Sequence, residues 1–201
     1  MIKCFIFDLG GVVIDFSNER DYYPYLSRVS GMPLNRVIRI VDRYVKVDLD
    51  KGTVSQRVFD KQVAMQLGIK EKEVKWHEMY KKKAGLFKGT IEIIKRLHVN
   101  YTVAYLSNID WSRYKHTVKI LKPYLGLFDY RFASCEIALR KPSAEIYRYA
   151  LRHMRYRPSE AIFIDNMMEN VVGARRAGIK SILFKSPAQL ESALRKMGVE
   201  L

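Results

Sequence analysis

The sequence has no apolar run approaching the roughly 20 residues that a helix needs to cross a bilayer. Its first residues, MIKCFIFDLGGVV, superficially resemble a secretory signal peptide because a lysine precedes an apolar stretch. However, Asp8 lies inside that stretch and no small-residue cleavage pattern follows it. We therefore expect no membrane span and no signal peptide, and we predict a soluble, cytoplasmic protein.

Cysteine is scarce, with Cys4 and Cys135 alone among the 201 residues. Neither has a second Cys or a His at the spacing that zinc ligands require. Thiols in a cytoplasmic chain are expected to stay reduced. The sequence therefore predicts two buried structural cysteines rather than a disulfide framework or a zinc site.

Acidic residues are few, because 21 Asp and Glu stand against 36 Lys and Arg and give a formal net charge of +15. This balance favours anionic partners such as phosphorylated metabolites or nucleic acid. The basic residues are spread along the whole chain, and no helix-turn-helix, zinc-finger or RNA-recognition signature occurs. We therefore expect a small phosphorylated ligand and no nucleic acid partner.

Four short, nearly continuous apolar runs are typical of strands that are buried on both faces, as in a parallel sheet. They cover residues 2–7, 101–106, 161–164 and 179–184. Helical patterns separate and follow them over residues 90–98, 143–154, 168–177 and 187–197. Thr90 is the expected N-cap of the first helix, and Gly178 is the expected stop of the third. This alternation predicts an α/β fold with a doubly wound parallel sheet.

The segment 16–87 breaks the alternation of strands and helices. Its patterns read as helices over about 18–30, 33–47, 53–67 and 70–84, and no convincing strand occurs. We therefore predict a helical-bundle cap domain, residues 16–87, inserted into a core domain of residues 1–15 and 88–201. Asp48, Lys51 and Gly52 are interpreted as a simple turn between two cap helices.

Polar residues follow three of the predicted strands at the point where each strand ends. They are Asp8, Ser107 with Asn108, and Asp165. Reactive groups in such sheets collect beyond the carboxyl ends of the strands. Ordinary structural roles are open for each of them, such as a turn cap for Asp8 or a helix N-cap for Ser107. Because three strand ends each deliver a polar group, the sequence predicts a functional site at this edge.

Four segments resemble the motifs of the haloacid dehalogenase (HAD) superfamily in their order and rough spacing. They are FDLGGVV at 7–13, YLSN at 105–108, RKP at 140–142 and FIDNMMEN at 163–170. Each is short, but together they span essentially the whole chain, and the helical insert follows the first of them. The DLGG segment is similar to a subgroup in which sugar phosphatases occur. The resemblance implies a Rossmann-like core with a helical cap and a hydrolase activity.

The resemblance also implies the roles of individual side chains. Asp8 matches the family's nucleophile, whose carboxylate attacks phosphorus and forms an aspartyl-phosphate. Lys141 matches the cation that compensates the charge of the transferring group. Ser107 and Asn108 match the segment that binds the phosphate oxygens. Arg140, beside the lysine, is interpreted as a surface residue.

Magnesium is the cofactor that the resemblance implies, held by Asp8, the carbonyl of Gly10 and Asp165. Gly10 is also the main departure from the family, because most of its phosphatases carry a second Asp there as general acid and base. Such catalysis contributes typically about 10²–10⁴-fold. The change predicts a slow enzyme, a substitute acid such as Asp15, or a leaving group that needs little protonation. Asn166 similarly stands where many members have an Asp.

We therefore predict a Mg²⁺-dependent phosphatase acting on a small phosphorylated metabolite, with a sugar phosphate as a candidate. Two alternatives stay open. A metal-independent 2-haloacid dehalogenase of the same fold suits the YLSN segment and the missing second Asp, whereas Asp165 argues against it. A catalytically impaired binding or regulatory protein suits Gly10 and Asn166.

Overall fold

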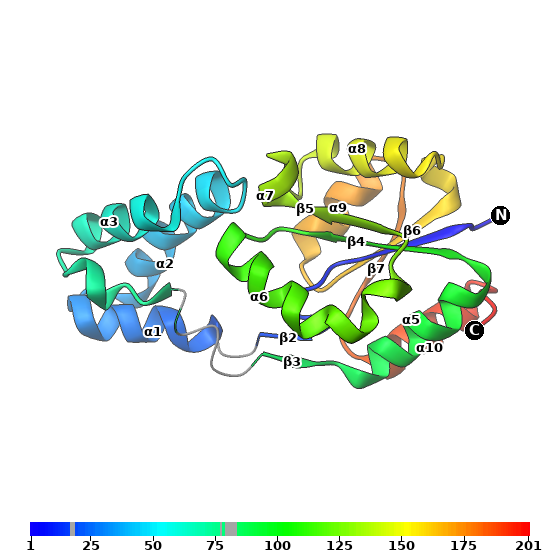
Figure 1. Ribbon diagram of the computed structural model, residues 1–201, viewed down its shortest axis with the longest axis horizontal. Helices are drawn as coiled ribbons and strands as arrows, with labels where there is room; N and C mark the ends of the chain where they lie inside the picture. The colour runs from blue at the N-terminus through cyan, green and yellow to red at the C-terminus, as the bar shows by residue number, and fades with distance from the viewer. Residues whose placement is uncertain (17–18, 77, 79–83) are drawn as a thin grey trace.

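A five-stranded parallel sheet with strand order β5-β4-β1-β6-β7 forms the centre of the larger part of the molecule (Figure 1). The structure is a computed structural model and describes residues 1–16, 19–76, 78 and 84–201. The sheet strands are β1 (Cys4–Phe7), β4 (Thr102–Ser107), β5 (Tyr130–Ala133), β6 (Ala161–Asp165) and β7 (Lys180–Leu183). The predicted doubly wound α/β fold is confirmed, and four of these strands coincide with the apolar runs.

Helices cover both faces of this sheet, which is why its central strands are apolar on both sides. They are α5 (Lys88–Asn100), α6 (Trp111–Leu121), α7 (Ser134–Ile137), α8 (Ala144–Met154), α9 (Met168–Arg176) and α10 (Pro187–Lys196), with short 3-10 turns η3 (Lys122–Leu127) and η4 (Pro158–Glu160). Phe5 and Phe7 pack with α5 and α10 on one face, whereas Cys4 and Ile6 pack with α8 and α9 on the other. Both faces are therefore closed to water.

The helix ends follow local chemistry, with one correction to the sequence analysis. Pro187 occupies the first turn of α10 behind the cap Ser186, and Gly178 follows α9 with a φ of 84°. Thr90 was expected to be the N-cap of α5, but that helix begins at Lys88 and Phe87 is its N-cap. Thr90 is fully buried instead, because the first turn of the helix packs against the sheet side of the core.

Three strands were not predicted. β5 contains the charged Arg131 and is an edge strand of the sheet, so its apolar signal is weak. The two-residue strands β2 (Ile14–Asp15) and β3 (Gly85–Leu86) form a small antiparallel ribbon. The expectation that residues 16–87 contain no strand is therefore wrong, because β3 is defined by its partner and not by its own sequence.

The remaining helices gather at one end of the molecule, away from the sheet (Figure 1). They are α1 (Glu19–Ser30), α2 (Leu34–Tyr44), the π-helix η1 (Val45–Leu49), α3 (Gln56–Leu67) and the 3-10 turn η2 (Glu71–Glu73). They enclose an apolar cluster of their own, in which Tyr22, Phe59 and Trp76 are central. Of the helix predicted over 70–84, residues 77 and 79–83 lie outside the described residues. The described part begins with the 3-10 turn η2 instead of an α-helix, and Lys75 interrupts it with a φ of 48°. The boundaries of the cap and core domains remain our proposal.

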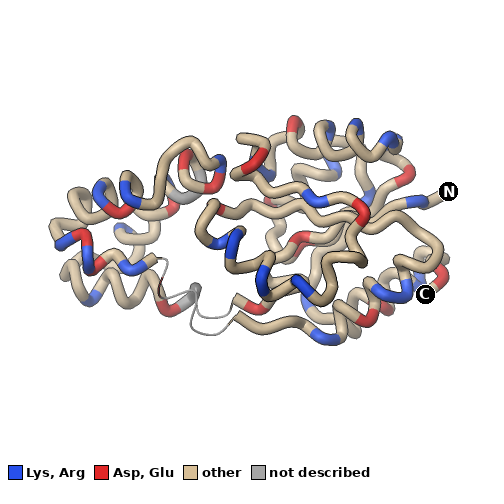
Figure 2. Tube along the Cα trace, viewed as in Figure 1, with Lys and Arg blue, Asp and Glu red and all other residues tan. Residues whose placement is uncertain are grey.

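The basic residues and the cysteines lie where the sequence predicts them. Lys and Arg are spread over the helices of both parts (Figure 2). Cys4 and Cys135 are buried and unpaired, as predicted. Among the described residues, no helix combines the length and apolar character that crossing a bilayer demands.

Candidate active site

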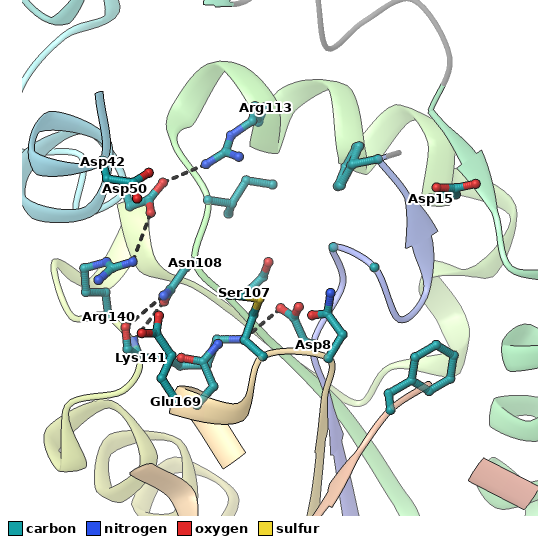
Figure 3. A pocket seen from close by; sticks show the side chains of 18 of the residues that line it. Asp8, Asp15, Asp42, Asp50, Ser107, Asn108, Arg113, Arg140, Lys141 and Glu169 are labelled. Atoms are coloured by element: carbon teal, nitrogen blue, oxygen red, sulfur yellow. Dashed lines mark hydrogen bonds and ion pairs between the residues drawn. The ribbon is translucent and has the colours of Figure 1, made fainter. Parts of the chain in front are cut away.

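The carboxyl ends of β4, β1 and β6 lie side by side, because β1 pairs in parallel with both neighbours. Asp8 directly follows β1, while Ser107 and Asp165 are the last residues of β4 and β6. A cavity of about 740 Å³ opens above them, and Asp8, Ser107 and Lys141 line it (Figure 3). Asp165 is completely buried beneath its floor. The topology thus brings the predicted polar strand ends together.

Lys141 joins the two carboxylates at the floor of the cavity. Its Nζ donates to Oδ1 of Asp8 at 2.8 Å and to Oδ2 of Asp165 at 2.7 Å. The ammonium is 1% exposed and also lies 5.3 Å from the centre of the Phe163 ring. Two buried carboxylates therefore share one buried ammonium, which leaves an excess of negative charge in a region of low dielectric.

The electrostatics of the site follow from this arrangement. The pKa of Asp8 is raised from 3.8 to about 6, because burial and the neighbouring Asp165 carboxylate raise it by more than the Lys141 ammonium lowers it. For Lys141, burial lowers the pKa, but the two carboxylates outweigh burial and the net pKa is raised. Lys141 is therefore charged at neutral pH, whereas Asp8 is a carboxylate that a further cation would stabilise.

Asn108 holds the backbone of Lys141 on both sides. The Asn108 amide donates from Nδ2 to the Lys141 carbonyl at 2.9 Å, and its Oδ1 accepts from the Lys141 N–H at 2.8 Å. This reciprocal pair fixes the loop that carries the lysine. Ser107 does not cap the helix that follows it, because Asp110 is the N-cap of α6 and accepts from the N–H groups of Ser112 and Arg113.

The residues at the floor fit a hard divalent cation. Asp8 and Asp165 are oxygen donors with an unbalanced negative charge, and Gly10 lines the same cavity beside them. Asn170 donates to Asp165 at 3.0 Å, while its own buried Oδ1 has no partner among the described residues. No three His, Cys, Asp or Glu side chains cluster in the described ranges, so a backbone carbonyl would have to complete the set. Asn170 was not among the predicted site residues.

Gly10 and Gly11 both lie against side chains of the cavity wall. A Cβ on Gly10 would lie 3.3 Å from the Phe16 ring, so that ring fills the space beside the position of the missing acid. Gly11 has a φ of 78°, and a Cβ there would lie 2.3 Å from the Asn166 amide nitrogen. Asn166 packs onto this glycine at the rim of the cavity. The site is therefore built around the DLGG turn.

The cap contributes the opposite wall of the cavity through Tyr23, Asp42, Asp50 and Trp76. Tyr23 donates its hydroxyl to Asp42 at 2.9 Å. Asp15, the predicted candidate for a substitute acid, also lines the cavity. Figure 3 shows Asp15 and Asp50 on opposite sides of it. The cavity therefore extends from the ribbon of β2 and β3 to the turn after η1.

A buried charge cluster, formed by Asp50, Arg113, Asp110 and Arg140, joins the cap to the core. Arg113 donates from Nη2 to Asp50 at 2.7 Å and from Nε to Asp110, and it lies 5.1 Å from the Trp76 ring. Arg140 contacts the other oxygen of Asp50 at 3.4 Å. Arg140 was interpreted as a surface residue, which is wrong, because its side chain is 16% exposed and lines the cavity.

The turn predicted at Asp48, Lys51 and Gly52 also packs against the core. Ser134 of the core donates its hydroxyl to the carbonyl of Asp50. Gly52 is pressed against the core, since a Cβ there would lie 2.6 Å from the carbonyl oxygen of Cys135. This docking was not predicted, because Asp50 and Arg113 lie 63 residues apart and their charges carry no local signal.

A Gly52→Ala variant should therefore lose more stability than backbone strain alone explains. Gly31 is a matched control, because both glycines have a φ of 68° and nothing lies within 4 Å of a Cβ on Gly31. We expect Gly52→Ala to unfold with a free energy about 1–3 kcal/mol lower than Gly31→Ala. Equilibrium denaturation of both variants measures this difference. Equal losses would contradict the docked position of the turn.

Comparison with known proteins places this geometry in a family. A family model described as haloacid dehalogenase-like hydrolase matches residues 2–178. A D-ribitol-5-phosphate phosphatase of Bacteroides thetaiotaomicron is 23% identical over 190 residues, 90% of this chain and 91% of the relative. A sesquiterpene phosphatase of Aspergillus oryzae is 24% identical over 181 residues, 88% of this chain and 87% of that protein. A HAD family enzyme of B. thetaiotaomicron, solved with magnesium and inorganic phosphate, shares the fold with a TM-score of 0.71. The two sequences are 22% identical, and the alignment covers 92% of this chain and 96% of that one.

Proposed function

The chain belongs to the haloacid dehalogenase-like hydrolases, and from this premise we propose that it hydrolyses a small phosphate ester with Mg²⁺ through an aspartyl-phosphate on Asp8. The observation that carries the proposal is the shared ammonium of Lys141 between Asp8 and Asp165 at the floor of the cavity. This arrangement supplies a nucleophile and a positive charge at one point. The phosphatase relatives and the magnesium and phosphate complex of a related structure support it.

In the proposed reaction, a carboxylate oxygen of Asp8 attacks phosphorus while the bond from phosphorus to the ester oxygen breaks. Lys141 and the hydroxyl of Ser107 stabilise the phosphoryl oxygens as charge moves onto the leaving oxygen. The leaving oxygen takes its proton from water, since Gly10 offers no acid. Water then attacks phosphorus, releases inorganic phosphate and restores the Asp8 carboxylate. When bound at Asp8, the carbonyl of Gly10 and Asp165, Mg²⁺ would supply further positive charge beside the transferring group.

Asn108 enters this proposal as a positioning residue. The sequence analysis assigned it to phosphate binding, but both ends of its amide are engaged by the backbone of Lys141. The amide therefore sets where the lysine chain begins, and Lys141 reaches the carboxylates from that point. We therefore assign the binding of phosphoryl oxygens to Ser107, which is 3% exposed at the cavity floor.

The finer part of the proposal is a sugar phosphate as substrate. The DLGG segment and the D-ribitol-5-phosphate phosphatase support it. Residue 10, which usually supplies the acid that protonates the leaving group, is a glycine, and the apolar Phe16 ring lies beside it. An anomeric oxygen, as in a sugar 1-phosphate, leaves with less help from an acid than a simple alkoxide does. This favours a sugar 1-phosphate over other sugar esters.

A screen of phosphate esters with and without Mg²⁺ tests the proposal. We expect hydrolysis that EDTA lowers by about 10³-fold and that added Mg²⁺ restores, because a bound metal is worth several kcal/mol of charge stabilisation. Release of inorganic phosphate is the measurement. Chloroacetate is assayed in parallel by chloride release. Chloride release that survives EDTA would replace this proposal with the dehalogenase, and no turnover of either class would leave a binding protein.

A further inference from the structure

Arg140 is a partly buried cation whose donors are largely unused. Its Nη2 approaches Oδ2 of Asp50 at 3.4 Å, which is the one polar contact of this side chain with the residues that the structure describes. Its Nε is buried and has no partner in the same set of residues. A guanidinium offers several N–H donors in a rigid fork. Most of the hydrogen-bonding capacity of Arg140 is therefore not used by the described residues.

Arg113 binds the same Asp50 carboxylate, and more of its N–H donors have partners. It binds Asp50 at 2.7 Å, donates from Nε to Asp110, and lies over the Trp76 ring. The charge of Asp50 is therefore met mainly by Arg113, at a distance 0.7 Å shorter than the contact with Arg140. Structural pairing with the cap accounts for Arg113 and leaves Arg140 without a sufficient partner.

The position of Arg140 points its charge at the cavity. It precedes Lys141 in the chain, and both residues line the same cavity as Asp8. Figure 3 shows the two side chains diverging, with Lys141 directed to Asp8 and the guanidinium of Arg140 lying toward Asp50 on the cap side. The cavity therefore has a cation at its catalytic floor and a second cation with spare donors toward the cap.

We propose that Arg140 binds a second anionic group of the substrate, a carboxylate or a second phosphate, at the cap end of the cavity. This inference rests on the proposed phosphatase function and narrows its substrate class. An oxyanion there would accept charge-assisted hydrogen bonds from the free donors of the fork, as carboxylates and phosphates do with arginine. Asp50 holds the guanidinium loosely enough for its free edge to face the ligand.

Matched pairs of probes test the inference. Glycerol 3-phosphate and 3-phosphoglycerate differ by a carboxylate, and fructose 6-phosphate and fructose 1,6-bisphosphate differ by a phosphate. We expect the unsubstituted chain to favour the doubly anionic member of at least one pair by about tenfold or more in kcat/KM. Arg140→Met should remove that preference through KM, and Arg140→Lys should restore part of it. A probe that is not hydrolysed is compared as a competitive inhibitor of p-nitrophenyl phosphate hydrolysis.

The controls separate this inference from the function on which it rests. Arg148→Met removes an exposed arginine of α8 outside the cavity and should keep the preference. A preference in the carboxylate pair alone assigns a carboxylate, and in the bisphosphate pair alone a phosphate. No preference in the unsubstituted chain, or a preference that survives Arg140→Met in a folded variant, overturns the inference. Absence of any hydrolysis that requires Asp8 would instead overturn the phosphatase proposal.

Discussion

An Asp8→Asn variant is expected to lose phosphate ester hydrolysis by at least about 10⁴-fold and, without Mg²⁺, to fold more stably than the unsubstituted chain. The activity is lost because an amide oxygen is a poor nucleophile toward phosphorus. The stability is gained because Asp8 and Asp165 compete for a single buried ammonium. With Asn at position 8, Lys141 and Asp165 form a balanced pair.

The pH dependence of this gain follows from the pKa of Asp8. In the folded chain that pKa is raised from 3.8 to about 6, chiefly by burial. The folded state therefore holds the proton more tightly than the unfolded state, and the unsubstituted chain loses stability as pH rises between these values. An asparagine does not titrate there. The stability difference should be small near pH 4 and reach about 3 kcal/mol at neutral pH, the order that the shift implies.

Urea denaturation of both chains at a series of pH values, in EDTA, measures the difference. Added Mg²⁺ should shrink it, because a metal that binds the folded unsubstituted chain stabilises that chain. Circular dichroism confirms that the variant keeps its fold. An inactive variant that is less stable at neutral pH would show that the Asp8 carboxylate is well balanced, which contradicts the charge excess at the cavity floor.

The parts of the fold that the sequence predicted are those with strong local signals. Three strands, β1, β4 and β6, are apolar on both faces, and this pattern predicts strands buried in a parallel sheet. β2 and β3 have two residues each and exist through their pairing with one another. Such elements depend on contacts between distant segments and cannot be inferred from either segment alone.

The candidate site divides in the same way. Asp8, Ser107 and Asp165 were predicted because strand topology alone brings strand ends to one edge of a sheet. Their catalytic roles came from the family resemblance and remain proposals. The reciprocal hydrogen bonds of Asn108 with Lys141, and the place of Arg140 in the cavity, depend on how loops approach one another. Of the two, Arg140 is the one that contacts the docked cap turn, through Asp50.

Arg113→Met should produce the largest loss of stability among the substitutions considered, about 3–5 kcal/mol, because it leaves buried carboxylates without their main cation. Asp50 is 3% exposed and Asp110 is 1% exposed. Asp110 keeps hydrogen bonds from the Trp76 indole and from backbone N–H groups, while Asp50 keeps the 3.4 Å contact with Arg140. Methionine preserves apolar contact with Trp76, so the loss reports mainly on charge.

Equilibrium denaturation of Arg113→Met, alone and combined with Asp50→Asn, separates charge from packing. Removing the Asp50 charge in the double variant should recover about 1–2 kcal/mol of the loss, since part of the damage is the buried charge itself. Arg148→Met, which removes an exposed arginine, should change stability by less than about 0.5 kcal/mol. If Arg113→Met unfolds within about 1 kcal/mol of the unsubstituted chain, the cluster contributes no more than a surface ion pair. The cap would then be held to the core by its other contacts, those of Gly52 with Cys135 and of Asp50 with the Ser134 hydroxyl.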